Sequence, residues 1–173
     1  MVDFEPDPNF SGIWTRSVKS YFDSRGSFRE VLRKSDLPLG VPEMLQESIS
    51  ISKGNVLRGM HYQEEQWQVI TLIRGLIQDI IVCVDENSDN YLESSPRYID
   101  DKGINQILIA PGLAHGFANL GEEAIIHYSS SVYFGATPQH GIHWESKPIK
   151  DLWEHRNWIV SERDSGFSLA EAR

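Results

Sequence analysis

The strongest constraint on the fold is a series of short apolar, β-branched runs that alternate with turn-forming residues from Glu47 onward. Three of these runs are QVITLIRGLIQDIIVCVD (68–85), INQILIAPG (104–112) and AIIHYSSSVYF (124–134). They are divided by Gly, Pro, Asn and Asp, which favour turns. We therefore predict many short strands in a β-sandwich or a small barrel, with a hairpin turn at Arg74-Gly75.

Helical signals are weak by comparison. SDLPLGVPEML (35–45) can hold a turn of helix, and DSGFSLAEAR (164–173) can end in one.

A chain of 173 residues with 40 % hydrophobic content suits one domain with a sizeable core. We expect a single all-β domain spanning residues 1–173, with a few short peripheral helices.

Charge and cysteine content narrow the function. The net charge of −9 argues against a surface for nucleic acid or an anionic membrane. Cys83 is the one cysteine, which excludes an intrachain disulfide and a zinc site built on several thiolates. No apolar run approaches the ~18 residues of a membrane span, and MVDFEPDPNF lacks the features of a signal peptide. We expect a cytoplasmic protein that binds neither nucleic acid nor a membrane.

The segment NVLRGMHYQ (55–63) places Arg58 and His61 three residues apart within a predicted strand. On a regular strand the two side chains would point to opposite faces. A single strand histidine is more often structural than catalytic. Gly59 changes this expectation, because glycine inside a strand often marks a bulge that re-aims side chains. A bulge here would bring Arg58 and His61 into one cavity.

Two later segments carry further candidates at or near strands. APGLAHGFAN (110–119) places His115 just beyond a strand that ends at Pro-Gly, where a solvated turn and a pocket are both reasonable. In IIHYSSS, the neighbours His127 and Tyr128 cannot both face inward on a regular strand. A core tyrosine with a satisfied hydroxyl is the ordinary interpretation of Tyr128.

The two ends of the chain carry polar segments. DSRGSFRE (23–30) reads as a turn followed by an aromatic residue, so Arg25 and Phe28 together could serve a phosphate and a base. SERDSGF (161–167) contains Asp164, which taken alone looks like a helix N-cap.

Taken in order, these segments resemble the dTDP-4-dehydrorhamnose 3,5-epimerase family of nucleotide-sugar epimerases. The resemblance runs from about Asp23 to Phe167 and includes DSRGSFRE, NVLRGMHYQ, the Arg-Gly turn, APGLAHGF, the strand with Tyr128, GIHWESKPIKDLW and VSERD. It implies a cupin-type jelly-roll β-sandwich that forms a homodimer. The implied substrate is a nucleotide-linked 4-keto-6-deoxyhexose, epimerised at C3, at C5 or at both carbons.

The resemblance also assigns roles. A base removes a proton that the 4-keto group has acidified, and an acid returns a proton to the opposite face of the ring. The implied base is His61, its orienting carboxylate is Asp164 and the acid is Tyr128. The implied contacts to nucleotide and sugar are Arg25, Phe28, Glu30, Gln46, Arg58 and His115.

The resemblance implies no cofactor and no metal. The first cupin motif normally supplies two metal-binding histidines as H-x-H, whereas this chain has His61-Tyr62-Gln63. One expected ligand is therefore absent, and stable metal sites need three or four ligands.

One position departs from the family pattern. Family enzymes carry a lysine shortly before the Arg-Gly turn, where it stabilises the enolate oxygen, and this chain carries Gln68 there. The amide of Gln68 can donate a hydrogen bond but carries no positive charge. Losing a good oxyanion donor typically costs about 10²–10³ in rate. Either another cation replaces the lysine, or the substrate needs less stabilisation, or the activity has drifted.

Three alternatives stay open at this point. A 3,4-ketoisomerase of the same fold would move the carbonyl instead of inverting a carbon. A non-catalytic cupin that binds nucleotide sugars would agree with the missing lysine. A metal cupin would need ligands besides His61 and His115.

Overall fold

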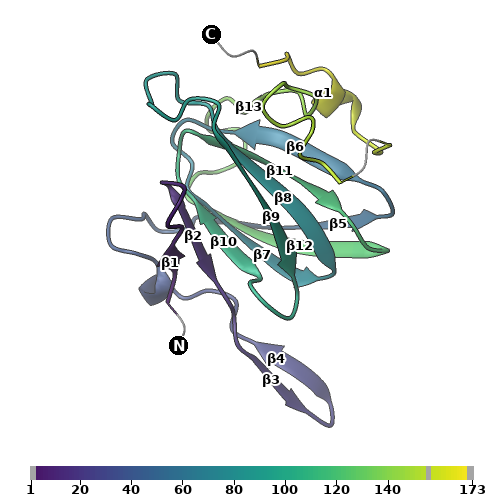
Figure 1. Ribbon diagram of the computed structural model, residues 1–173. Helices are drawn as coiled ribbons and strands as arrows, with labels where there is room; N and C mark the ends of the chain where they lie inside the picture. Colours follow the sequence, from purple (N-terminus) through teal and green to yellow (C-terminus); the bar gives the residue numbers. More distant parts are fainter. Residues whose placement is uncertain (1–2, 155–156, 171–173) are drawn as a thin grey trace.

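The computed structural model describes residues 3–154 and 157–170, which form two facing β-sheets and a projecting hairpin (Figure 1). The six-stranded sheet has the order β1-β2-β10-β7-β12-β5, and the five-stranded sheet has the order β13-β6-β11-β8-β9. The hairpin consists of β3 and β4. Neighbouring strands within each sheet are antiparallel. The all-β sandwich predicted from the strand runs is confirmed.

The strands are β1 (Glu5–Pro6), β2 (Ile13–Arg16), β3 (Ser20–Asp23), β4 (Gly26–Arg29), β5 (Gln46–Lys53), β6 (Leu57–Tyr62), β7 (Gln68–Arg74), β8 (Leu76–Cys83), β9 (Ser94–Asp100), β10 (Gln106–Ile109), β11 (Leu113–Asn119), β12 (Glu123–Ser130) and β13 (His140–Gly141). A 3-10 turn, η1, spans Lys34–Asp36, and a short helix, α1, spans Glu162–Ser165.

The first of the two helical predictions is met in part, and the second is not met among the described residues. The turn η1 overlaps the start of the predicted segment 35–45. The helix α1 covers only the start of the segment 164–173, whereas the prediction placed a helical turn at its end, and residues 166–170 are not helical. Positions 171–173 of that segment lie outside the described residues.

The predicted hairpin at Arg74-Gly75 is wrong. Strand β7 belongs to the six-stranded sheet and β8 to the five-stranded sheet, so the chain crosses between sheets at this point. Gly75 has φ +109°, and a Cβ there would lie 2.4 Å from the carbonyl oxygen of Glu123. Glycine therefore permits a tight corner that a side chain would block. A hairpin within one sheet and a crossing between two sheets have the same strand–turn–strand sequence pattern.

Alternating side chains give the sandwich three apolar layers. The inner layer between the sheets includes Ile70, Leu72 and Ile126 from one sheet and Ile77, Ile81 and Phe117 from the other. The C-terminal segment, with Ile149 and Trp153, covers the outer face of the five-stranded sheet. On the outer face of the six-stranded sheet, Trp14, Val69 and Leu108 pack against the segment around Leu37. Burial on both faces explains why the interior strand β8 is apolar at every position except Gln78 and Asp79.

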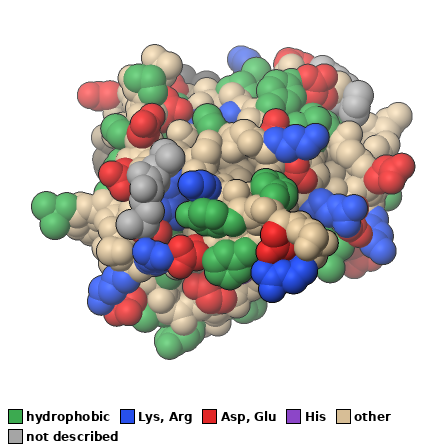
Figure 2. All heavy atoms as spheres, turned by 90° about the horizontal axis from the view of Figure 1, so that it is seen from below, with side chains coloured by type: hydrophobic (Ala, Val, Ile, Leu, Met, Phe, Trp, Pro, Cys, Tyr) green, Lys and Arg blue, Asp and Glu red, His purple; other side chains and the backbone are tan. Residues whose placement is uncertain are grey.

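The β3–β4 hairpin is mostly exposed. It extends away from the lower end of the sandwich in Figure 1, and its aromatic side chains Tyr21, Phe22 and Phe28 are exposed. Seen from below, Lys and Arg side chains are interspersed with Asp and Glu and with exposed apolar side chains (Figure 2). This face therefore has no continuous basic area.

Among residues 3–154 and 157–170, no helix has the length and apolar character needed to cross a membrane.

Candidate active site

A bulge in β6 puts Arg58 and His61 on the same face of the sheet. His61 pairs with His115 of β11, Arg58 pairs with Phe117, and the register shifts between the two pairs. Paired residues of an antiparallel ladder share a face. Phe117 belongs to the inner core, so Arg58 and His61 both lie on the inner face of the five-stranded sheet. The predicted bulge at Gly59 is confirmed.

Gly59 is required at this bulge by its backbone and by its neighbour. Its φ is +130°, a conformation that residues with a side chain rarely adopt, and a Cβ would lie 2.4 Å from Cα of Gly116. Its N–H donates a hydrogen bond to Oδ2 of Asp164 at 3.1 Å. The bulge therefore also supplies the donor that holds Asp164 beside His61.

His61 and Asp164 form a close pair. Nε2 of His61 lies 2.7 Å from Oδ1 of Asp164, whose side chain is buried. Ser161 is the N-cap of α1, and its Oγ accepts a hydrogen bond from the N–H of Asp164. The interpretation of Asp164 as an N-cap is thus wrong: the residue lies in the first turn, and its carboxylate is free to bind His61.

Electrostatics fix the proton on this pair. Burial alone raises the pKa of Asp164, but the hydrogen bond and charge of His61, together with the N–H of Gly59, outweigh burial and lower it. The carboxylate is therefore ionised at neutral pH and can only accept hydrogen bonds. In the neutral imidazole, Nε2 must then carry the proton, which leaves the lone pair on Nδ1.

Tyr128 lies on the inner face of the opposite sheet. It packs against the inner core, and its hydroxyl is 3.3 Å from Oγ of Ser50. His127 turns to the outer face, where it pairs with Glu47, so the prediction that only one neighbour faces inward is confirmed. Burial raises the pKa of Tyr128 to about 12, and the Ser50 hydrogen bond and the Arg58 charge offset only part of this rise. Tyr128 is therefore a neutral proton donor at physiological pH.

A polar row crosses the same sheet next to Tyr128. Ser130 pairs with Gln46 on one side and with Gln68 on the other. Nε2 of Gln68 is 3.5 Å from Oγ of Ser130, and Oε1 of Gln46 accepts the N–H of Phe134 at 2.7 Å. Gln68 thus presents an uncharged amide on the face that carries Tyr128.

Arg58 connects the two sheets. Its Nε donates to Oγ of Ser52 at 2.9 Å, and its Nη2 donates to the carbonyl oxygen of Ile51 at 3.3 Å. Both acceptors belong to β5, so the guanidinium spans from one inner face to the other. A cation in this place favours the developing charge of any anion bound between the sheets.

Sequence reasoning missed Asp79. Its fully buried carboxylate lies 3.4 Å from Nδ1 of His115, and its Oδ1 has no hydrogen-bond partner among the described residues. A carboxylate within the apolar run IQDIIVC was the available signal, because a buried charge is costly unless it is paired. His115, one of the predicted contacts, is therefore held by a second carboxylate.

Three predicted contact residues lie apart from this group within one chain. Arg25 pairs with Asp23 in its own hairpin turn at 2.6 Å, and Glu30 pairs with Arg33 at 2.5 Å. Phe28 is 64 % exposed. In Figure 1 the hairpin that carries Arg25 and Phe28, and that Glu30 directly follows, extends from the end of the sandwich opposite to β6 and β13. One chain therefore brings together the predicted acid–base residues but leaves the hairpin residues outside.

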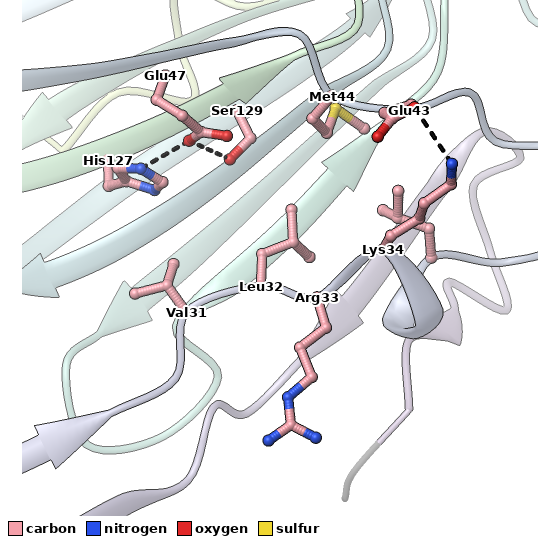
Figure 3. Close-up of a pocket in the computed structure, with 10 residues that line it drawn as sticks. Val31, Leu32, Arg33, Lys34, Glu43, Met44, Glu47, His127 and Ser129 are labelled. Atoms are coloured by element: carbon pink, nitrogen blue, oxygen red, sulfur yellow. Dashed lines mark hydrogen bonds and ion pairs between the residues drawn. The ribbon is translucent and has the colours of Figure 1, made fainter.

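A separate pocket of about 340 Å³ lies on the outer face of the six-stranded sheet (Figure 3). Its floor carries Glu47, which accepts a hydrogen bond from Ser129 at 2.7 Å and pairs with His127 at 2.7 Å. Residues of the segment 31–44 line its other side. Because His127 and Tyr128 face opposite sides of β12, this pocket is on the far side of the sheet from the candidate acid.

The residues around His61 do not form a metal-ligand cluster. Within residues 3–154 and 157–170, no group of three or more His, Cys, Asp or Glu side chains is placed to hold a metal ion. At the third position of the first cupin motif, Gln63 donates to the carbonyl oxygen of Thr137 at 3.2 Å.

Comparisons with known proteins agree on one family. The family model for dTDP-4-dehydrorhamnose 3,5-epimerase matches residues 8–171. The dTDP-4-dehydrorhamnose 3,5-epimerase of Methanothermobacter thermautotrophicus is 32 % identical over 154 residues, covering 85 % of this chain and 83 % of that protein. A dTDP-4-dehydrorhamnose 3-epimerase of Streptomyces niveus is 28 % identical over 170 residues, covering 94 % and 82 %.

A solved structure gives the same result at the level of the fold. The dTDP-4-dehydrorhamnose 3,5-epimerase of Bacillus anthracis, determined with TDP and PPi bound, superimposes with a TM-score of 0.85 at 28 % identity, covering 95 % of this chain and 97 % of that one. The expected cupin-type jelly-roll fold is confirmed. This chain belongs to the dTDP-4-dehydrorhamnose 3,5-epimerase family of isomerases.

Proposed function

We propose that this protein epimerises C3, C5 or both carbons of a nucleotide-linked 4-keto-6-deoxyhexose. The observation that carries the proposal is the His61–Asp164 pair on one inner face, with the neutral hydroxyl of Tyr128 on the opposite inner face. Inversion needs a base and an acid on opposite sides of the sugar ring. A sugar held between the two sheets would meet one group on each side.

The chemistry follows from the protonation states. Nδ1 of His61 takes the proton from the carbon next to the 4-keto group, and the C–H electron pair moves to the carbonyl oxygen to give an enolate. Asp164 stabilises the imidazolium that forms. The hydroxyl of Tyr128 protonates the same carbon from the other face as the carbonyl re-forms. Solvent then returns a proton to Tyr128 and accepts one from His61.

Two further groups support the charged states of this cycle. The amide of Gln68 is the donor that we assign to the enolate oxygen, since it lies in the row beside Tyr128. Arg58 already lowers the pKa of Tyr128 against the effect of burial, so it also favours the tyrosinate that protonation of the carbon leaves behind. Neither group needs to move a proton itself.

We propose a deoxythymidine diphosphate as the nucleotide part, as the names of the relatives indicate. Arg58 and Arg25 would hold the diphosphate, and Phe28 would stack on the base, with Glu30 and Gln46 as polar contacts. We assign the contact to the sugar to His115. The cytoplasm stays the predicted compartment.

We further propose that the active unit is a homodimer. Strand β5 is an edge of the six-stranded sheet, and Ile49 and Ile51 on its outer face are exposed. Open edges of this kind are usually paired or covered. The β3–β4 hairpin of a second copy would cover this edge and bring Arg25 and Phe28 toward Gln46, the first residue of β5.

Incubation with a dTDP-linked 4-keto-6-deoxyglucose in D₂O tests the activity. We expect deuterium at C3, at C5 or at both, together with an epimerised product seen by NMR. A product with the carbonyl moved to C3 would identify a 3,4-ketoisomerase. Calorimetric binding with no exchange at either carbon would contradict the proposal and favour a non-catalytic binding protein.

A further inference from the structure

A second aromatic ring touches the candidate base. The ring of Phe167 stands edge-on to the imidazole of His61, with 5.8 Å between the ring centres and an interplanar angle of 74°. Aromatic rings favour this arrangement because the positive edge of one ring meets the negative face of the other. Phe167 lies three residues after Asp164, so one short segment contacts His61 twice.

The neighbouring strand β13 leaves room for the ring of Phe167. Gly141 of β13 pairs directly with His61, and a Cβ on Gly141 would lie 2.4 Å from Cε2 of Phe167. It would also lie 2.6 Å from the carbonyl oxygen of Met60. The phenyl ring of Phe167 thus occupies the space that a side chain at position 141 would fill, so the ring fits beside His61 only because residue 141 is glycine.

The segment that carries Phe167 is anchored at a further point. The guanidinium of Arg163 lies over the Phe167 ring at 5.8 Å, and its Nη2 donates to Oε1 of Gln139 at 2.5 Å. Gln139 belongs to the loop that follows β12, in which Phe134 binds Gln46. The ring is therefore held between Gly141, Arg163 and His61.

We propose that Phe167 is a positioning residue that fixes the plane of the His61 ring. The single hydrogen bond from Nε2 to Asp164 fixes one atom of the imidazole but lets the ring rotate about that contact. A second contact on the ring removes this freedom, so Nδ1 keeps one direction. Small misplacements of a reacting group cost much of the rate, which makes such a contact functionally important. The inference rests on the proposed role of His61 as base.

The test compares Phe167→Ala with Phe167→Tyr, which retains the ring, and with Leu169→Ala, an exposed neighbour in the same segment. Turnover is measured as deuterium exchange into the 4-keto sugar, and the ring nitrogens of His61 are followed by ¹⁵N NMR. For Phe167→Ala we expect kcat to fall about tenfold or more with KM nearly unchanged. We expect the His61 signals to shift from a single Nε2-protonated tautomer toward a mixture. Phe167→Tyr and Leu169→Ala should match the wild type.

Two results would overturn the inference. One is an unchanged kcat in Phe167→Ala. The other is a lower kcat with His61 signals identical to those of the wild type, because ring orientation would then not be the cause. If the wild-type protein exchanges no deuterium, the proposed function fails, while the NMR comparison still decides whether Phe167 sets the His61 ring.

Discussion

The inner faces near His61 and the β3–β4 hairpin differ in how their polar groups are satisfied. Around His61, Asp164, Arg58 and His115 each bind a partner from another element: Asp164 binds β6, Arg58 binds β5 and His115 binds β8. In the hairpin, Arg25 binds Asp23 within its own turn, and the aromatic side chains remain exposed. The polar contacts near His61 therefore join several elements of one chain. The contact of Arg25 stays within the hairpin turn, and the aromatic side chains of the hairpin remain exposed to solvent.

This difference suggests that the residues for proton transfer and the residues for nucleotide binding are positioned in different ways. The proposed acid–base groups need a fixed geometry, and the core between the two sheets supplies it. The hairpin residues that the family resemblance assigns to the nucleotide have no such support in one chain. We therefore infer that proton transfer depends on a single chain, and that nucleotide binding depends on the hairpin of a second copy.

Removal of His61 should have the largest effect. In His61→Ala the proposed base is lost, and we expect exchange into the substrate to fall by about 10³-fold, within the range for general-base catalysis. Deuterium incorporation measured by NMR gives the rate. His140→Ala is the matched control, because His140 stacks on Tyr62 toward the outer face of the sheet. An equal loss in both variants would indicate a general loss of structure.

Tyr128→Phe should come next. Removing the hydroxyl takes away the donor on the opposite face but leaves the base intact, so proton removal can continue while inversion cannot. We expect the formation of epimerised product to fall by about 10²-fold. The exposed Tyr98, which lies on β9, serves as the control in Tyr98→Phe. Retention of full epimerisation in Tyr128→Phe would show that another group supplies the proton.

Two substitutions of Gln68 should change kcat by smaller amounts and in opposite directions. Gln68→Ala removes a neutral hydrogen-bond donor, and we expect kcat to fall about tenfold, the equivalent of one good hydrogen bond. Gln68→Lys restores the charge that the family resemblance leads one to expect, and we expect kcat to rise. Steady-state kinetics on both variants would decide, and a lower kcat in Gln68→Lys would mean that this site is adapted to an uncharged donor.

The smallest expected effect concerns pH. A pKa of about 12 for Tyr128 means that the fold favours the neutral phenol, so this group stabilises the protein below pH ~10 and loses that contribution as pH rises from about 10 toward 12. Between pH 8 and 10, Tyr128 should stay protonated. The difference in absorbance near 295 nm between the wild type and Tyr128→Phe measures this titration, and a midpoint near 10 would contradict the assigned burial.

The residues that were predictable from the sequence are those whose effect is local. Runs of β-branched residues predicted strands at 104–112 and 124–134, and Gly59 predicted the bulge because glycine inside a strand often marks one. The corner at Gly75 was not predictable, because the choice between pairing with β8 and crossing to another sheet depends on contacts far along the chain. Asp79 was hidden for a similar reason: its partner His115 is 36 residues away.

The contact of Phe167 with His61 and the isolation of the hairpin belong to the same class. Both depend on how distant segments meet, and neither leaves a pattern within a short stretch of sequence. The family resemblance named Arg25, Phe28 and Glu30 but did not say which chain of a dimer they serve.

We propose that the base of one chain works with the hairpin of its partner. Two inactive proteins test it directly when mixed: His61→Ala and the double variant Arg25→Ala/Phe28→Ala. In a mixed dimer, one site combines an intact His61 with an intact hairpin, so random mixing should restore about a quarter of the wild-type sites. As a control, His61→Ala mixed with Asp164→Asn should restore nothing, because both residues serve the same site of one chain. We expect recovery of about a quarter of the deuterium exchange, and no recovery in the hairpin mixture would show that the hairpin does not serve the partner's site.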